Sequence, residues 1–206
     1  MESQSTDIVL LSAGVESTTL LYTLREREPL ALCIDYGQRA AEREYEYARV
    51  HCERLGLRLR HFDIGTAGSA FRAGQSRKLH VPIPHRNLFI LSLSLCFAAQ
   101  QGAARTWIAL NREDAAAHAS ASAEFLAQLN RLAATLGAVR VEAPLLGYSK
   151  ADVIQLGRAQ GVDFALTYSC LLGRARHCGS CPQCQSRRRA FEAADSPEPA
   201  GFYVHR

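Results

Sequence analysis

Four cysteines near the C-terminus are the residues of this chain whose types and spacing most clearly specify chemistry. They follow the pattern Cys-x7-Cys-x2-Cys-x2-Cys, at Cys170, Cys178, Cys181 and Cys184. Four thiolates this close together can surround one Zn²⁺ in a tetrahedral site that leaves no position open for a substrate. The pattern therefore predicts a structural zinc site within residues 168–190. An iron–sulfur cluster is the alternative, because two consecutive x2 gaps also occur in cluster-binding sequences.

A second candidate site is the loop that follows the apolar run Ile8–Leu11. The loop and its flanks contain Leu11, Ser12, Ala13, Gly14, Val15, Glu16, Ser17, Thr18 and Thr19. Small residues let backbone N–H groups surround a phosphate, and a following helix adds the positive end of its dipole. The segment is not a Walker A loop, because no Gly-Lys-Ser/Thr follows. Taken alone, the segment is a weak signal, and a plain strand–turn–helix with Ser/Thr capping is the favoured interpretation.

The elements that would position these residues are indicated by apolar runs that alternate with amphipathic segments. The pattern predicts strands at 8–11, 30–35, 57–64, 106–110 and 139–142, and helices at 17–25, 42–55, 87–100, 120–136 and 149–160. A βαβα order of this kind indicates an α/β fold, a doubly wound parallel sheet of about five strands, formed by one domain over residues 1–206. Such sheets bind ligands at the carboxyl ends of their strands.

Composition excludes several classes. No apolar run is long enough to span a bilayer, and no secretory leader is recognisable, so we expect a cytoplasmic protein without a membrane partner. The net charge of +4 suits an anionic small molecule and does not demand nucleic acid. We interpret the basic run Arg187–Arg189 as a solvated helix end, with a nucleic-acid contact as the weaker alternative. Residues 195–206 are expected to form a loosely held tail. Cys33, Cys52 and Cys96 are expected to be core residues.

The loop after the first strand resembles the Ser-Gly-Gly-x-Asp-Ser loop of the N-type ATP pyrophosphatases. Those enzymes split ATP into AMP and pyrophosphate while they adenylate a substrate. Ala13 replaces a glycine of that pattern, and a Cβ there costs energy if the position requires a positive φ. Glu16 replaces an aspartate, which keeps the charge but moves the carboxylate by one methylene.

Further segments resemble one branch of those enzymes, the 7-cyano-7-deazaguanine synthases (QueC). The matching motifs are Asp35-Tyr36-Gly37-Gln38-Arg39, Val81-Pro82 with Arg86-Asn87, Pro144-Leu145 with Lys150, and Thr167-Tyr168-Ser169-Cys170 followed by the other three cysteines. The motifs occur in order over nearly the whole chain. The cysteine segment is the most specific of them.

This resemblance implies an adenine nucleotide alpha hydrolase-like fold, structural Zn²⁺, ATP with Mg²⁺, a homodimer, and activation of 7-carboxy-7-deazaguanine for attack by ammonia. The products would be an amide and then a nitrile, with AMP and pyrophosphate released. It implies catalytic roles for Ser12, Glu16, Ser17 and Lys150. Nucleotide binding would fall to residues 11–19 with Tyr36, Gln38 and Arg39, and substrate binding to Arg86, Asn87, Asn111 and Asp114.

One segment departs from the family pattern, which carries Gly-x-Asn-x-x-Asp and then polar and aromatic residues. Here Asn111 and Asp114 remain, but residues 115–123 are alanine, serine and one histidine, His118. Losing hydrogen-bonding groups changes which ligands a site accepts. The segment therefore predicts a paralogue with a changed substrate or a protein acceptor, for example in antiphage defence, or else a non-catalytic nucleotide-binding partner. His118 is as consistent with an exposed residue as with a substrate contact.

Overall fold

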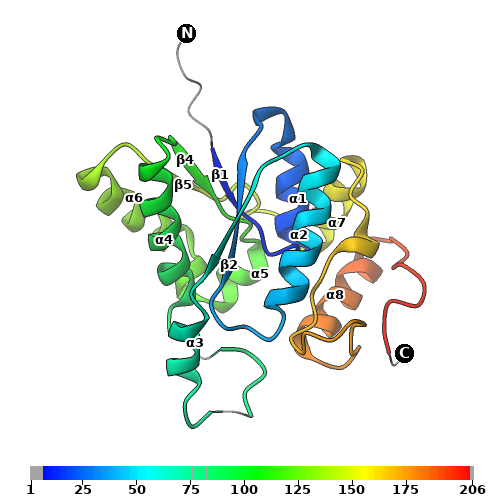
Figure 1. Ribbon diagram of the computed structural model, residues 1–206. Helices are drawn as coiled ribbons and strands as arrows, with labels where there is room; N and C mark the ends of the chain where they lie inside the picture. Colours follow the sequence, from blue (N-terminus) through cyan, green and yellow to red (C-terminus); the bar gives the residue numbers. More distant parts are fainter. Residues whose placement is uncertain (1–6, 76, 82, 205–206) are drawn as a thin grey trace.

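A parallel five-stranded sheet forms the centre of the protein in a computed structural model that describes residues 7–75, 77–81 and 83–204 (Figure 1). The strand order is β3-β2-β1-β4-β5. The strands are β1 (Ile8–Leu10), β2 (Leu30–Asp35), β3 (Leu59–Asp63), β4 (Arg105–Trp107) and β5 (Arg140–Glu142). All pairings are parallel, with Ile8 opposite both Leu30 and Thr106. The predicted α/β class and strand number are confirmed.

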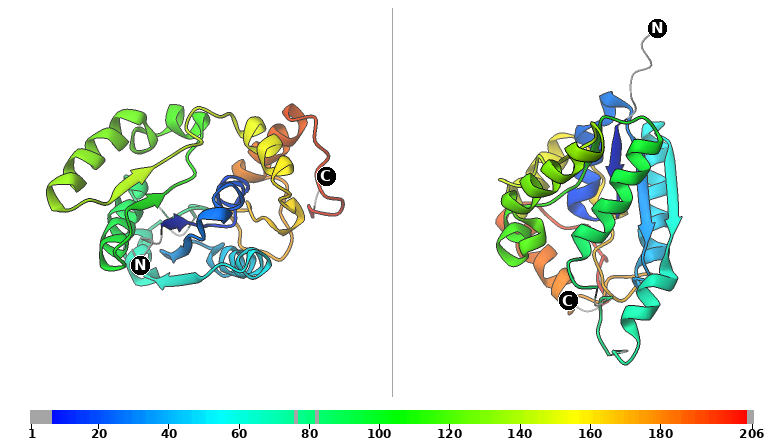
Figure 2. Two further views of the ribbon diagram at one scale, coloured as in Figure 1. Left: turned by 90° about the horizontal axis from the view of Figure 1, so that it is seen from above. Right: turned by 90° about the vertical axis from the view of Figure 1, so that its left-hand side faces the viewer.

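Helices cover both faces of this sheet (Figure 2). On one side lie α1 (Val15–Thr23), α2 (Ala41–Leu55) and α7 (Lys150–Ala159), with α8 (Pro182–Ala193) against α7. On the other lie α4 (Arg86–Gln100) and α6 (Ala123–Leu136). Residues of β1 alternate between the two cores: Val9 packs with the first set and Ile8 and Leu10 with the second. The doubly wound arrangement is thereby confirmed.

Several element boundaries differ from the predicted ones. The helix predicted at 120–136 begins at Ala123, because the Ser122 side chain caps it by accepting a hydrogen bond from the Phe125 N–H. Short helices α3 (Gly65–Arg72) and α5 (Arg112–Ala117), and helix α8, were not predicted as elements. Short 3₁₀ turns complete the described elements at Arg25–Arg27, Ala119–Ala121 and Phe164–Leu166. Ser149 caps α7 as expected, in a capping box with Asp152.

The prediction of a loose C-terminal tail is wrong for the described part of that segment. Ser196 is buried, and Glu198 and Tyr203 contact residues of α8. Cys33 and Cys52 are buried as predicted, but Cys96 is exposed because it lies on the outer side of α4. Within the described ranges, no helix combines the length and apolar character needed to cross a membrane. Pro82 of the Val81-Pro82 motif lies outside the described residues.

Candidate functional site

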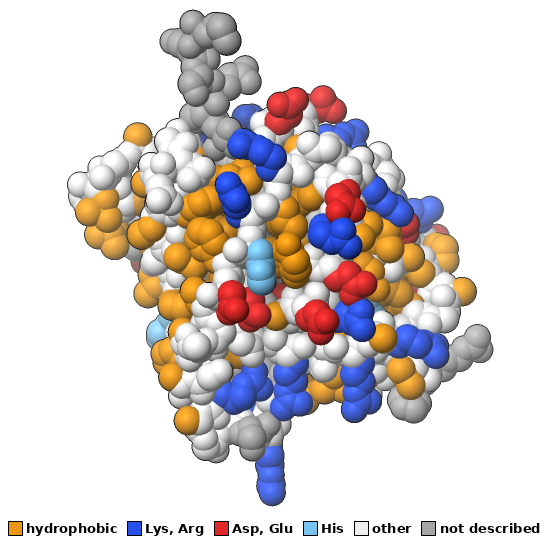
Figure 3. Space-filling model, viewed as in Figure 1, with side chains coloured by type: hydrophobic (Ala, Val, Ile, Leu, Met, Phe, Trp, Pro, Cys, Tyr) orange, Lys and Arg blue, Asp and Glu red, His pale blue; other side chains and the backbone are white. Residues whose placement is uncertain are grey.

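A cavity of about 310 Å³ lies where the strand order reverses between β1 and β4. Chains that leave neighbouring strands in opposite directions open a crevice at such a point, and ligands bind there. Leu10, Ile34 and Ile108 line it from the carboxyl ends of β1, β2 and β4. Lys and Arg side chains gather along the lower edge of the face in Figure 3, the side toward which β1 runs. This distribution favours an anionic ligand at that edge.

The loop between β1 and α1 forms one wall of the cavity through Ser12, Gly14, Glu16 and Ser17. Ser17 Oγ accepts a hydrogen bond from the Ser12 N–H, and the two hydroxyl oxygens are 3.2 Å apart. Gly14 is the extended residue before the helix, so the first N–H groups of α1 face the loop. Ala13 has φ 51°, the left-handed conformation that favours glycine.

An ion pair joins this loop to α7. Lys150 Nζ lies 2.8 Å from Glu16 Oε1, and Asn111 Nδ2 donates to the same oxygen at 3.2 Å. Burial alone would raise the pKa of the Glu16 carboxyl, but the Lys150 ammonium outweighs burial and holds the pKa below its ordinary value. Burial lowers the pKa of the Lys150 ammonium, but the negative charge of Glu16 outweighs burial, so the pKa of Lys150 lies above its ordinary value. Both groups are charged at neutral pH.

Asn111 and Asp114 begin helix α5 beside this pair. Asn111 Oδ1 accepts a hydrogen bond from the Asp114 N–H, and Asp114 Oδ2 accepts one from the Asn111 N–H, which forms a capping box. Burial, and then the negative charge of Glu16, raises the pKa of Asp114. Asp114 lines the cavity together with His118. Asn111 does not line it, but its side chain holds Glu16, which does.

The predicted residues that follow β2 and begin α4 also line the cavity: Tyr36, Gln38, Arg39, Arg86 and Asn87. The Arg86 guanidinium lies 5.7 Å from the centre of the Tyr36 ring and donates to its hydroxyl at 3.3 Å. Asn87 Nδ2 donates to the Ser120 carbonyl, which ties α4 to the altered segment.

Four residues predicted to bind nucleotide have side chains outside the cavity: Ala13, Val15, Thr18 and Thr19. Ala13 and Val15 pack in the core under the loop, and Thr19 Oγ1 lies 3.5 Å from the Val153 carbonyl. Their side chains therefore support the loop, and any contact of theirs with a phosphate would involve the backbone. The sequence offered no sign of this division, because small polar residues suit both places.

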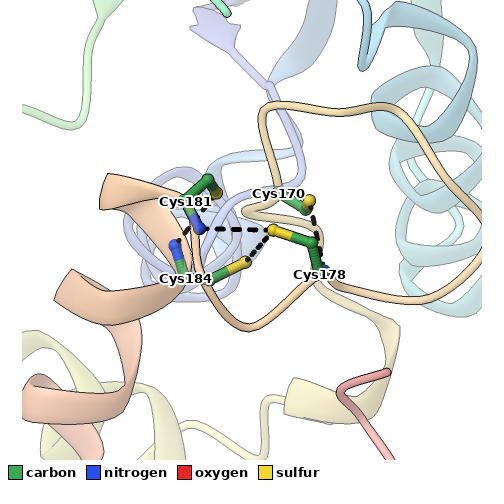
Figure 4. A group of neighbouring side chains, drawn as sticks. All are labelled: Cys170, Cys178, Cys181 and Cys184. Atoms are coloured by element: carbon green, nitrogen blue, oxygen red, sulfur yellow. Dashed lines mark hydrogen bonds between the residues drawn. The ribbon is translucent and has the colours of Figure 1, made fainter. Parts of the chain in front are cut away.

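The four cysteines converge as their spacing predicts (Figure 4). Their sulfurs all lie within 4.8 Å of one another, and all four residues are buried. Zn–S bonds of about 2.3 Å in a tetrahedron place sulfurs roughly 3.8 Å apart, close to the 3.9 Å between Cys178 and Cys184. Backbone N–H groups of Cys178, Cys181 and Cys184 donate to sulfurs of the cluster. The donor set fits a single zinc ion without an open position.

The interpretation of Arg187 as a solvated residue is wrong. Its side chain is fully buried, and its nitrogens donate to Glu198, Thr167 and the Phe164 carbonyl. Five donors in a planar fork satisfy partners in several directions at once, which explains how a buried guanidinium is tolerated. Arg189, by contrast, is exposed.

Sequence reasoning missed several residues of the cavity wall, among them Glu44 and Ser169. Glu44 from the first turn of α2 lines it, as does Ser169 next to the first cysteine of the cluster. A usable signal for Glu44 is its place six residues after Gln38, at the start of a helix that follows a strand end. His177 is a buried neighbour of the cluster, whose Nε2 accepts a hydrogen bond from the Ser169 N–H at 2.8 Å.

Solved structures with the same fold come from several enzymes. NMN synthetase from Francisella tularensis matches with a TM-score of 0.56 and 15% identity, covering 96% of this chain and 80% of that one. The U34-tRNA thiolase NcsA from Methanococcus maripaludis, a structure with its [4Fe-4S] cluster, matches with a TM-score of 0.55 and 15% identity, over 93% and 66% of the two chains. At these identities the likeness shows the fold alone.

Relatives in sequence are closer. The family model described as "Queuosine biosynthesis protein QueC" matches residues 6–195. The chain is 35% identical to 7-cyano-7-deazaguanine synthase 1 of Sulfurisphaera tokodaii, over 95% of this chain and 96% of that protein. It is 36% identical to the 7-cyano-7-deazaguanine synthase of Methanothermobacter thermautotrophicus, over 95% and 98%. The chain therefore belongs to the QueC family and is homologous to 7-cyano-7-deazaguanine synthases, which are ATP-dependent enzymes.

Proposed function

We propose that this protein is an ATP-dependent ligase that adenylates the carboxylate of 7-carboxy-7-deazaguanine and transfers the acyl group to ammonia. One observation carries the proposal: a single cavity brings together a phosphate-type loop, the Glu16–Lys150 pair and a wall formed by Tyr36 and Arg86. The first two suit a nucleotide polyphosphate, and the third suits a flat heterocycle. Membership in the QueC family supports the same substrates.

In the proposed reaction the substrate carboxylate attacks the α-phosphorus of ATP, and the bond from that phosphorus to pyrophosphate breaks. Ammonia then attacks the acyl carbon, AMP leaves, and the amide forms after loss of a proton. The amide oxygen then attacks the α-phosphorus of a second ATP, and a second pyrophosphate leaves. Departure of AMP with loss of the two amide protons leaves the nitrile.

The residues of the cavity would act mainly by position and charge. Ser12, Ser17 and the N–H groups at the start of α1 would donate to the leaving pyrophosphate, and Lys150 would offset its charge. Glu16 would hold Lys150 until the phosphates arrive. The carboxylates of Glu16 and Asp114 are oxygen ligands of the type that Mg²⁺ takes, and a bound Mg²⁺ would neutralise phosphate charge.

The four cysteines would hold the proposed zinc in a purely structural role. Their closed donor set leaves no position for a substrate, and the segment they fold supplies Ser169 and Leu171 to the cavity wall. The sulfurs also lie close enough for one ion, which favours zinc over an iron–sulfur cluster.

We also propose the homodimer that the family resemblance implies, which light scattering of the zinc-loaded protein would test.

The test is ATP turnover by the zinc-loaded protein with Mg²⁺ and ammonium, with and without 7-carboxy-7-deazaguanine, following AMP and the base by mass spectrometry. We expect AMP only when the base is present, with amide or nitrile product. Lys150→Met should lower the rate about 10²-fold or more, whereas Arg158→Met, which removes an exposed cation from the same helix, should not. Absence of AMP under these conditions would contradict the proposal.

A changed acceptor is the second candidate, because of one observation in the altered segment. Ser122 caps α6, the Ser120 carbonyl accepts from Asn87, and Ala121 is buried, so these residues support the fold. Among residues 115–123, only His118 lines the cavity. An acceptor pocket with few polar groups of its own would suit an amine other than ammonia, including one on a partner protein. Replacing ammonium by primary amines in the same assay would separate the two candidates.

A further inference from the structure

A third carboxylate, besides Glu16 and Asp114, lines the cavity. Glu44 lies in the first turn of α2, is partly buried, and lines the cavity together with Tyr36 and Arg86. The proposed chemistry assigns it no step. A carboxylate that faces a ligand cavity is costly to keep there without a partner, so its surroundings indicate what it binds.

One oxygen of Glu44 is held in place by Gln38. Gln38 Nε2 donates to Glu44 Oε2 at 2.8 Å and to the Ile34 carbonyl at 3.1 Å, while its Oε1 accepts from the Tyr36 N–H at 2.9 Å. Gln38 is therefore fixed to the backbone on both sides. Among the described residues, none donates a hydrogen bond to the other oxygen, Oε1, which leaves its lone pairs available to the cavity.

No cation forms an ion pair with Glu44 among the described residues, in contrast to Glu16. The charged groups that face it are Arg86 on α4 and Asp35 at the end of β2. Burial raises the pKa of the Glu44 carboxyl to about 7. The hydrogen bond from Gln38 and the charge of Arg86 lower this pKa, and the negative charge of Asp35 raises it. Neutral N–H donors would satisfy such a carboxylate without placing a second charge in the cavity.

The cavity wall that includes Glu44 also offers surfaces that suit a flat ring. Leu32, Ile34 and Ile90 supply apolar surface, and Tyr36 supplies an aromatic ring beside the Arg86 guanidinium. A guanine-type ring presents a ring N–H and an exocyclic amino group side by side, which match the two oxygens of an ionised carboxylate. The corresponding edge of adenine alternates a donor with an acceptor, so it does not match.

We propose that Glu44 binds the ring N–H and exocyclic amino group of the substrate heterocycle, with Gln38 as its positioning residue. This inference rests on the proposed function, because it assumes that the base enters this cavity. It assigns the selection of a guanine-type base to a residue outside the phosphate-type loop and outside the motifs that carry the family resemblance.

The experiment is calorimetric binding of two bases to the zinc-loaded protein without ATP. One is 7-carboxy-7-deazaguanine, and the other is the same ring without the exocyclic amino group. The unmodified protein should prefer the first by roughly tenfold or more, because the analogue leaves a buried acceptor unpaired. Glu44→Gln should weaken binding of the first base by about 30-fold or more and bring the preference to within roughly threefold. Glu42→Gln, an exposed carboxylate in the same turn, is the matched control.

A pH series gives a readout that a merely structural role would not move. Protonation of Glu44 removes acceptor lone pairs, so affinity of the unmodified protein for the base should fall as pH decreases through about 7. The Glu44→Gln variant should lack this dependence, while the Glu42→Gln control should keep it. Should the Glu44→Gln protein fail to fold, the pH series of the unmodified protein with the two bases still tests the proposal, since their difference must vanish at low pH.

Failure of this proposal is distinguishable from failure of the proposed function. Unchanged preference in Glu44→Gln, with normal binding of the base, overturns the inference and leaves the function intact. Loss of MgATP binding in Glu44→Gln, with the base unaffected, also overturns it and places Glu44 at the adenine. If the unmodified protein binds MgATP but neither base, the proposed function is overturned and the inference with it.

Discussion

Ala13 holds a left-handed backbone conformation while its methyl group is fully buried. The conformation costs a non-glycine residue about 1–2 kcal/mol. A glycine at this position would lack the buried methyl group, which stabilises the fold by about 0.8 kcal/mol. It would also make the unfolded chain more flexible, which costs the folded state roughly 0.4–1 kcal/mol. The two sides nearly cancel, which explains how an alanine persists where the related pattern has a glycine.

We therefore expect Ala13→Gly to change the free energy of unfolding by less than about 1 kcal/mol, because relief of strain offsets the losses. Ala13→Val should destabilise by about 1–3 kcal/mol, since a β-branched residue tolerates positive φ poorly and overpacks the core. Urea unfolding of the three proteins measures both. A change of more than about 2 kcal/mol for the glycine variant would show that one side of this balance is wrong.

Lys150→Met should destabilise the protein at neutral pH, because it leaves the Glu16 carboxylate, 18% exposed, without its cation. We expect a loss of about 1–3 kcal/mol at pH 7. The folded pKa of Glu16 is depressed, so the pair stabilises above the ordinary value of 4.5 and loses this contribution as pH falls through the folded pKa. The variant loses the largest influence that lowers this pKa, so burial raises the pKa of Glu16 relative to the unmodified protein.

The difference in stability between Lys150→Met and the unmodified protein should therefore shrink as pH falls from 7 toward 4. Urea unfolding at both pH values measures it, and Arg158→Met on the same helix serves as control. A penalty that stays constant with pH would mean that lost packing, rather than the unpaired carboxylate, dominates.

Individual residues show where sequence reasoning succeeds and where it fails. The cysteine spacing alone predicted a cluster, because four ligands so close in sequence have few ways to meet. Arg187 was misread, because burial of an arginine depends on Glu198 and Phe164, which lie far from it in any local pattern. Tertiary contacts of this kind leave no periodic signal.

At the level of elements, α8 and the cysteine segment depend on each other. Cys181 caps α8 and Cys184 lies within its first turn, so the predicted metal ion would fix the start of the helix. The segment has few apolar side chains of its own beyond the cysteines and Tyr168. The order of this segment should therefore depend on the metal more strongly than the order of the sheet does.

Removal of zinc by a chelator should loosen residues 168–190 and the C-terminal residues that pack on them, while the sheet stays folded. Hydrogen exchange measured by mass spectrometry would report faster exchange in these segments and unchanged exchange in β1 and β2. Restoring Zn²⁺ should reverse the effect. Cys184→Ser should reproduce it with zinc present, and a global loss of protection instead would mean that the segment and the sheet fold as one unit.

Arg187→Lys should be destabilising although the charge is kept. Lysine cannot reach Glu198, Thr167 and the Phe164 carbonyl together, so it leaves partners unsatisfied in a fully buried place. We expect a loss of about 3–5 kcal/mol, measured by urea unfolding. Arg189→Lys, exposed on the same helix, should stay within about 0.5 kcal/mol. Equal effects would contradict the buried role of Arg187.

Element types were easier to predict than element boundaries. The buried strand β2 is a continuous apolar run of the kind that parallel sheets require, so its position was predicted correctly. Helix α5 was missed because its six residues are too short for a periodic pattern, and Asn111 was considered only as a substrate contact rather than as a cap. Local capping competes with function for the same side chains.

For the molecule as a whole, the cavity is where the two cores and the cysteine segment meet. β1 and β2 supply its floor, α2 and α4 supply Glu44 and Arg86, and the cysteine segment supplies Ser169. A ligand that fills the cavity would thus touch parts of the chain that are far apart in sequence. Ligand binding should stabilise all of them together, because binding energy adds to the free energy of unfolding.

Saturation with MgATP and 7-carboxy-7-deazaguanine should therefore slow hydrogen exchange in three separate segments: 12–17, 36–44 and 168–171. At 100 times the dissociation constant, one ligand adds about 2.7 kcal/mol to stability, which corresponds to roughly 100-fold slower exchange where opening requires release of the ligand. Helix α6 lines no part of the cavity and serves as the internal control. Protection confined to 12–17 would show that the nucleotide binds without the rest of the site. Protection of 12–17 and 36–44 without 168–171 would separate the cysteine segment from substrate binding and leave it a role in folding alone.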